Sequence, residues 1–126
     1  MATPEQVRSV VDEYIAASNA GDRAAVLALF APDAVWYDPV GQPPHTGLDA
    51  IGAFYDQART MADHIEMKPS DVIVCGNEAA MVFEIHVTIG DGGMVMDAVE
   101  TFDINDDAKI VGMKAYWDMT RARSRA

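Results

Sequence analysis

Apolar positions in the first half of the chain recur at the spacing of amphipathic helices. Thr3 and Pro4 start the first helix, because a threonine cap followed by proline suits a first helical turn, and Gly21 ends it. Its apolar stripe comprises Val7, Val10, Val11, Tyr14, Ile15 and Ser18. The pattern predicts a second helix over residues 22–30, a short strand over 34–37 and a third helix over 48–62.

From Glu66 onward the hydrophobic period changes from helical to alternating, which is typical of strands. The expected strands cover residues 65–68, 71–75, 79–89, 94–104 and 109–117, with the basic tail after residue 119 frayed. Turn-forming residues separate them at 76–77, 91–93 and 105–107. Three helices followed by an antiparallel meander predict a single α+β domain over residues 1–126. Long strands must curl around the helices to bury their apolar faces, so we expect a cone with an internal pocket.

Glu100 is the most unusual residue of the predicted strand 94–104. Side chains alternate between the two faces of a strand, so Glu100 shares a face with Met94, Met96, Ala98, Phe102 and Ile104. An isolated charge is very costly among such side chains, and a buried carboxyl group avoids that cost by staying protonated. A neutral carboxylic acid donates a hydrogen bond and can stabilise an oxyanion. The alternative is a buried glutamate paired with a lysine or arginine.

Two further polar side chains share the apolar faces. Tyr14 lies in the middle of the first helical stripe, so its hydroxyl points inward and needs a partner. Asp38 ends a strand whose inward face carries Ala34 and Trp36, and Pro39 keeps it extended. Taken singly, each has an ordinary explanation: a core tyrosine bonded to a carbonyl, and an Asp-Pro turn. Tyr55, on the buried stripe of the third helix, could hydrogen-bond Tyr14.

The remaining candidates are apolar. Alternation places several large side chains on inward strand faces, where they form either core or the wall of a pocket: Phe83, Met113, Ala115 and Trp117. Phe54 shares the third helix's stripe with Ile51 and Tyr55.

The three histidines lack the spacing of a zinc site, so we expect no metal.

Composition narrows the possible partners. Half of the 126 residues are apolar and the net charge is −11, which disfavours binding to nucleic acid or to an anionic membrane surface. A neutral small ligand remains compatible with this charge. The first residues contain neither a basic start nor an apolar run, so we expect a cytoplasmic protein.

Several segments together resemble the ketosteroid isomerases, members of the SnoaL-like proteins within the cone-shaped superfamily of nuclear transport factor 2. The resemblance covers most of the chain. It lies in Tyr14-Ile15-Ala16-Ala17-Ser18-Asn19-Ala20-Gly21-Asp22, in Asp33-Ala34-Val35-Trp36-Tyr37-Asp38-Pro39-Val40-Gly41-Gln42-Pro43-Pro44, in Ile51-Gly52-Ala53-Phe54-Tyr55, in Asn77-Glu78-Ala79-Ala80 and in Lys109-Ile110-Val111-Gly112-Met113-Lys114-Ala115-Tyr116-Trp117. It implies three helices packed on a strongly curved, mainly antiparallel sheet, in a cone-shaped barrel that forms homodimers.

The resemblance also implies an activity, the conversion of 3-oxo-Δ5-steroids into 3-oxo-Δ4-steroids without a cofactor. Asp38 would be the general base, and Tyr14 with protonated Glu100 would form the oxyanion hole. Tyr55 would support Tyr14, while Phe54, Phe83, Met113, Ala115 and Trp117 would contact the steroid. Ketosteroid isomerases usually carry aspartate where this chain has Glu100, and the alignment depends on the turn at residues 105–108.

Two other functions remain open from the sequence. One is a polyketide cyclase-like enzyme of the same fold, which would use Asp38 as the base on another enolisable substrate. The other is a protein that binds steroids or other hydrophobic ligands with little turnover. An epoxide hydrolase of this fold would need an arginine between two acids at the pocket floor, and the pattern places no arginine on an inward face.

Overall fold

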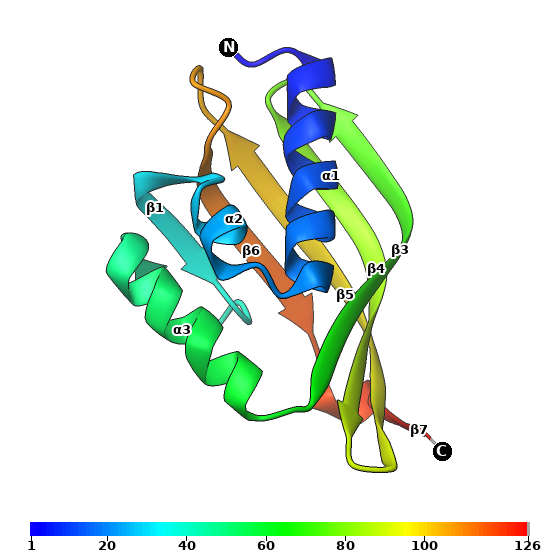
Figure 1. Cartoon of the computed structure of the whole chain (residues 1–126). Helices are drawn as coiled ribbons and strands as arrows, with labels where there is room; N and C mark the ends of the chain where they lie inside the picture. Colours follow the sequence, from blue (N-terminus) through cyan, green and yellow to red (C-terminus); the bar gives the residue numbers. More distant parts are fainter. Residues whose placement is uncertain (126) are drawn as a thin grey trace.

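Three helices cover one face of a strongly curved sheet in the computed structural model, which describes residues 1–125 (Figure 1). The helices are α1 (Pro4–Ala20), α2 (Arg23–Leu27) and α3 (Leu48–Thr60), with a short 3-10 helix η1 at Met119–Arg121. The strands are β1 (Phe30–Tyr37), β2 (His45–Thr46), β3 (His64–Cys75), β4 (Glu78–Ile89), β5 (Gly92–Ile104), β6 (Ile110–Trp117) and β7 (Arg123–Arg125). The α+β prediction is confirmed.

The strands form one sheet in the order β2-β1-β6-β5-β4-β3, with β7 added alongside β5. Neighbours pair antiparallel except β1 and β6, which run parallel. Helix α1 lies against β3 and β4, and α3 lies against β1 and β2. The sheet is not closed into a barrel among the described residues, because β2 and β3 remain at its two edges. An open cone therefore surrounds the space between the helices and the sheet.

The sequence signals at the ends of α1 act as expected. The Thr3 hydroxyl accepts a hydrogen bond from the Gln6 amide, and the Gln6 side chain accepts one from the Thr3 amide. This reciprocal capping box satisfies two amide groups that have no partner within the helix. Gly21 ends the helix at φ 68°, a conformation that glycine adopts without a steric penalty. The buried stripe of α1 includes Tyr14 and Ser18, which places both against the sheet.

Several element boundaries differ from the predicted ones. The second helix stops at Leu27, and Phe30 already begins β1, where it pairs with Ile110 of β6. The two strands expected at 65–68 and 71–75 are one strand, β3, with an irregularity between Pro69 and Asp71. Proline has no amide hydrogen to donate, so a break in the ladder at this position has a direct cause.

The expectation of a frayed carboxyl tail is wrong for the described residues. Residues 123–125 pair with β5 as strand β7. Arg123 contacts Asp97 at 3.1 Å and Glu84 at 3.1 Å, and Arg121 contacts Asp97 at 3.2 Å. The basic tail is thus held by acidic side chains on the outer face of the sheet, a long-range pairing that composition alone did not reveal.

Alternation along β5 follows the predicted pattern. Met96, Ala98, Glu100, Phe102 and Ile104 are all buried, while their neighbours Asp97 and Asp103 face outward.

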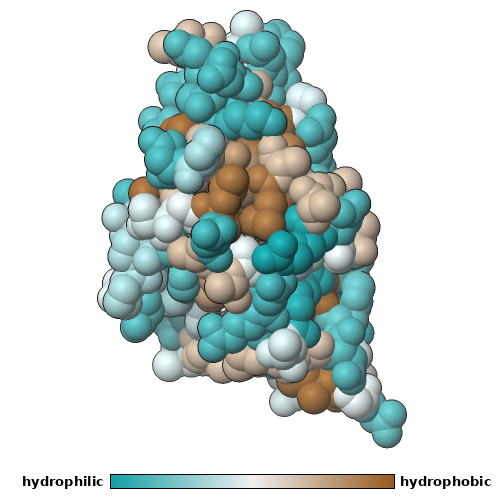
Figure 2. Space-filling model, turned by 60° about the vertical axis from the view of Figure 1, so that its left-hand side comes forward, coloured by the Kyte–Doolittle hydropathy of each residue, from teal (hydrophilic) through white to brown (hydrophobic). Residues whose placement is uncertain are grey.

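No described helix is long and apolar enough to cross a membrane. The surface carries an apolar patch on one face with hydrophilic residues around it (Figure 2).

Candidate active site

Glu100 lies inside the cone, as its strand position predicted. Only 3% of its surface is exposed, and its Oε1 atom has no hydrogen-bond partner among residues 1–125. No lysine, arginine or histidine lies within 4.0 Å of its carboxyl group in the described part of the chain. The alternative of a buried ion pair is therefore not realised.

Asp38 follows the last residue of β1 and belongs to the same cavity. The Trp117 indole Nε1 donates a hydrogen bond to Asp38 Oδ1 over 2.6 Å. The bond joins residues 79 positions apart in the chain, and the parallel pairing of β1 with β6 makes it possible. Tyr37 pairs with Lys114, so Asp38 and Ala115 continue this register.

Strand register sets how Asp38 and Glu100 face each other. Ala115 on β6 is the direct partner of Glu100 on β5, and its carbonyl accepts a hydrogen bond from Val40 just beyond Asp38. Asp38 and Glu100 therefore lie on opposite sides of Ala115. Their backbones are two strand spacings apart, which is ~10 Å. A methyl side chain between them leaves room for a ligand to reach both carboxyl groups.

Tyr14 completes the polar group from the helical side. Its ring packs edge-on against Phe102 at 5.4 Å between centroids and against Phe30 at 6.5 Å, which fixes its direction. Burial raises the pKa of Tyr14 well above its ordinary value, and the charges of Glu100 and Asp38 raise it further. The hydroxyl therefore stays protonated and available as a donor.

The two acids have perturbed protonation equilibria for identifiable reasons. Burial raises the pKa of Glu100 well above its ordinary value, the Asp38 charge adds to this, and hydrogen bonding with Tyr14 opposes it. Burial also raises the pKa of Asp38, but the Trp117 hydrogen bond and the charge of His45 lower it. The environment thus favours neutral Glu100 while Asp38 keeps groups that stabilise its carboxylate, which is the division of labour expected of a donor and a base.

The cavity that joins these groups has a volume of about 240 Å³. Its predicted wall residues Phe54, Phe83, Ala115 and Trp117 line it together with Tyr14, Tyr55, Asp38 and Glu100. Met113 does not line it, because this side chain is buried in the core beneath, 1% exposed, with Phe102 as its strand partner. Met113, Phe102 and Ala79 are paired across β6, β5 and β4, one inward-facing row away from the row of Ala115, Glu100 and Met81.

Tyr55 lines the cavity without the expected hydrogen bond. Its hydroxyl is buried and has no hydrogen-bond partner among residues 1–125, so the bond to Tyr14 is not formed in this structure. Trp36 Nε1 is likewise buried without an acceptor among those residues. Trp36 packs against Phe30 and Phe54, which accounts for the position of its ring.

Sequence reasoning missed several lining residues and one cation. Ile65, Met67, Ile85, Val87 and Met96 complete the apolar wall; alternation along the strands could have found them. The expectation that no arginine faces inward is wrong, since Arg59 on α3 lines the cavity. It lies four positions after Tyr55, a spacing that puts two side chains on one helix face.

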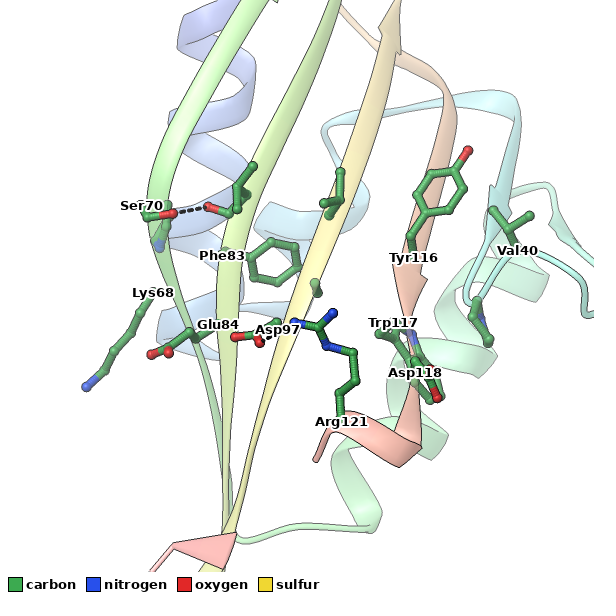
Figure 3. Close-up of a pocket in the computed structure, with 15 residues that line it drawn as sticks. Val40, Lys68, Ser70, Phe83, Glu84, Asp97, Tyr116, Trp117, Asp118 and Arg121 are labelled. Carbon is green, nitrogen blue, oxygen red and sulfur yellow. Dashed lines mark hydrogen bonds and ion pairs between the residues drawn. The ribbon is translucent and has the colours of Figure 1, made fainter. Parts of the chain in front are cut away.

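A larger hollow, of about 1010 Å³, lies on the other face of the sheet (Figure 3). Two of its charged side chains, Arg121 and Asp97, form an ion pair at 3.2 Å, as Figure 3 shows. It contains no buried acid or hydroxyl group, so the inner cavity is the better site for chemistry. Among residues 1–125, no cluster of three histidine, cysteine or acidic side chains could hold a metal ion.

Comparisons with known proteins agree with this fold. Residues 11–113 match the family model described as a SnoaL-like domain. The chain therefore belongs to the SnoaL-like family, within the superfamily of nuclear transport factor 2-like proteins.

The relatives by sequence are enzymes. The chain is 31% identical over 112 residues to the Steroid Delta-isomerase of Nocardioides simplex, with 89% of each chain covered, which confirms the resemblance to ketosteroid isomerases. It is also 32% identical over 122 residues to the Epoxide hydrolase LasB of Streptomyces lasalocidi, covering 90% of this chain and 42% of that protein.

Solved structures match the fold along nearly the whole chain. SalBIII, described as an epoxide hydrolase/cyclase-like enzyme in pyran ring formation in polyether salinomycin, has a TM-score of 0.88 at 23% identity, covering 97% of this chain and 98% of its own. RV0760c from Mycobacterium tuberculosis has a TM-score of 0.87 at 22% identity, covering 98% and 99%. These likenesses show the fold.

Proposed function

We propose that this protein is a steroid Δ-isomerase that converts 3-oxo-Δ5-steroids into 3-oxo-Δ4-steroids. The observation that carries the proposal is the convergence of Asp38, Tyr14 and Glu100 on one apolar cavity, with the pKa values of Tyr14 and Glu100 raised. The relative from Nocardioides simplex supports this choice of reaction.

The reaction needs one base and a site for negative charge. The Asp38 carboxylate removes a proton from C4 of the steroid, and the electron pair moves through the C3 carbonyl to give a dienolate. Tyr14 and neutral Glu100 donate hydrogen bonds to the C3 oxygen as its charge develops. Protonated Asp38 then returns the proton to C6, which leaves the double bond conjugated and Asp38 ionised. The proposal includes no cofactor, because every step moves only a proton.

The cavity suits this chemistry physically. Donors fixed in a site with little water stabilise a developing oxyanion strongly, because no solvent has to reorganise. The apolar wall matches a flat hydrocarbon skeleton, and the Ala115 methyl group leaves space between the base and Glu100. Trp117 keeps Asp38 in position and favours its ionised form.

A direct assay tests the function. Purified protein mixed with 5-androstene-3,17-dione is expected to raise the absorbance of the conjugated enone, whereas Asp38→Asn protein is expected to give only the uncatalysed rate. A wild-type rate equal to the uncatalysed rate would contradict the proposal. Product identity is checked by chromatography against the Δ4 isomer.

An epoxide hydrolase is the second candidate, because LasB is a relative of similar identity. The geometry favours it less. Arg59 lines the cavity but has no carboxylate within 4.0 Å among the described residues, so it does not lie between two acids. Turnover of a terminal or steroidal epoxide to a diol, without isomerisation of the ketosteroid, would favour this second function.

We also propose that two copies of the chain pair through the outer sheet face. Val82 and Tyr116 are 44% and 45% exposed there, beside the half-buried Val99. Basic Lys68 and acidic Glu84 flank this strip, so two copies can place opposite charges together. Sedimentation of wild-type and Val82→Glu protein tests the pairing: a dimer that the variant loses supports it, and a wild-type monomer contradicts it.

A further inference from the structure

Arg59 is the one basic side chain among the described residues that line the inner cavity. It lies in the last turn of α3 and is partly buried. The rest of the lining is largely apolar, apart from the three groups assigned to the reaction, Tyr55 and Trp36, and the residues Ser18 and Asn19. The proposed isomerisation has no step that uses a cation, so the role of Arg59 is unassigned.

The guanidinium group is held in place but only partly used. One nitrogen, Nη2, donates to the Ser18 carbonyl at the end of α1, and the group lies over the Tyr55 ring at 5.0 Å from its centroid. A guanidinium has five N–H donors and stays ionised, so one bond leaves donors for a ligand. By contrast, Arg23 on the surface is paired with Asp56 at 2.7 Å.

Arg59 also lies away from the reacting groups. Its Ser18 partner follows Tyr14 by one turn of α1, a rise of roughly 6 Å along the helix. An opposite charge within about 4–6 Å would lower the pKa of a carboxyl group, and Arg59 is not among the groups that shift the pKa of Asp38 or Glu100. The cavity therefore has an acid-and-hydroxyl end and a cationic end.

We propose that Arg59 binds a carboxylate at the end of the substrate remote from the enolisable carbonyl. This inference rests on the proposed function and specifies its substrate class as 3-oxo-Δ5-steroid acids. A carboxylate takes two parallel N–H bonds from a guanidinium, and such charge-assisted bonds are about twice as strong as neutral ones. A wholly neutral steroid would offer the free N–H donors of Arg59 no anionic acceptor.

A matched pair of substrates tests the inference. The probes are 3-oxoandrost-5-ene-17β-carboxylate and its methyl ester, which has the same skeleton without the charge. We expect the kcat/KM of wild-type protein to be ~10-fold or more higher for the acid than for the ester, because hydrogen bonds to charged groups contribute about 1.5–3 kcal/mol. The gain should appear as a lower KM for the acid, with a similar kcat for both substrates. The assays use 0.15 M salt, which screens the general repulsion of an anion by this acidic protein.

Variants separate the charge of Arg59 from its contact with α1. Arg59→Gln keeps an amide donor for the Ser18 carbonyl but removes the charge, and we expect the acid-to-ester ratio to fall to about one. Arg59→Lys is expected to keep a reduced preference. The control is Arg8→Met: Arg8 also bonds a backbone carbonyl, that of Val72, but lies outside this cavity, so the ratio should stay at the wild-type value.

Each outcome bears on a different statement. A wild-type protein with no preference for the acid, or an Arg59→Gln variant that retains it, overturns the role of Arg59 even if isomerisation is confirmed. If neither substrate nor 5-androstene-3,17-dione is isomerised, the proposed function fails. Calorimetry with the matching Δ4 acid and ester then decides the role of Arg59 alone: acid-selective binding lost in Arg59→Gln supports it, and equal binding of acid and ester contradicts it.

Discussion

The indole of Trp117, at the end of β6, donates a 2.6 Å hydrogen bond to the carboxylate of Asp38 just after β1. Burial raises the pKa of Asp38. The hydrogen bond from Trp117 lowers that pKa more than the charge of His45 does. Trp117 therefore both orients the proposed base and keeps it ionised in an apolar cavity. The pairing depends on the parallel contact between β1 and β6.

Replacing Trp117 by phenylalanine is expected to shift the pH dependence of catalysis. Loss of the donor raises the pKa of Asp38 further, so the acid limb of the kcat/KM profile should move to higher pH. The profile measured with 5-androstene-3,17-dione checks this. Tyr116→Phe, on the outer face beside it, is the control and should leave the acid limb in place. An unchanged limb in Trp117→Phe would show that the bond does not tune the base.

Asp38→Asn should remove the base while keeping the shape of the side chain. A positioned general base contributes typically 10²–10⁴-fold, so kcat should fall by at least ~10². Phenolic steroids mimic the dienolate and need only the oxyanion donors, so their binding should persist. Fluorescence titration with such a phenol measures this. Loss of catalysis and binding together would indicate a misfolded variant, which circular dichroism would reveal.

Tyr14→Phe should weaken the oxyanion site without changing the packing of the ring. The ring would keep its contacts with Phe102 and Phe30, whereas the donor is lost. Removal of one such donor typically costs roughly 10²–10³ in kcat. Steady-state kinetics at one pH measure the effect, and a kcat within about threefold of wild type would contradict the assigned role.

Glu100→Gln should change how stability depends on pH. The folded pKa of Glu100 is raised above its ordinary value of 4.5, so between the two values the folded state binds more protons than the unfolded state. The free energy of unfolding therefore falls as pH rises through this window, by up to ~1.4 kcal/mol per pH unit. Glutamine does not titrate, so the variant should lose this slope.

Urea unfolding at several pH values from 4.5 upward measures the Glu100→Gln effect. The exposed Glu78, replaced by glutamine in the same way, is the control and should keep the wild-type slope. An identical slope in wild type and Glu100→Gln would mean that Glu100 is ionised in the folded protein. The oxyanion role would then fail as well, since a carboxylate cannot donate.

The positions of Tyr14, Asp38 and Glu100 could be predicted because local periodicity determines which face a side chain takes. Along β5 the buried set is the one that alternation gave, and α1 buries Tyr14 on its predicted stripe. The signal for the site was a carboxyl group, that of Glu100, on a strand face whose other side chains are apolar. Met113 shows the limit of this reasoning, because alternation gives the inner face but not the level at which the cavity ends.

Contacts between distant segments were decided only by the tertiary structure. The Trp117–Asp38 bond and the placement of Ala115 between two acids require the register of β1, β6 and β5. The entry of Arg59 into the cavity depends on how α3 packs against the end of α1. The sequence by itself determined the faces of the helices and strands, since these follow from backbone geometry within each element. The tertiary structure decided which faces meet, at what level and with which charges, because that depends on register and packing between elements far apart in the chain.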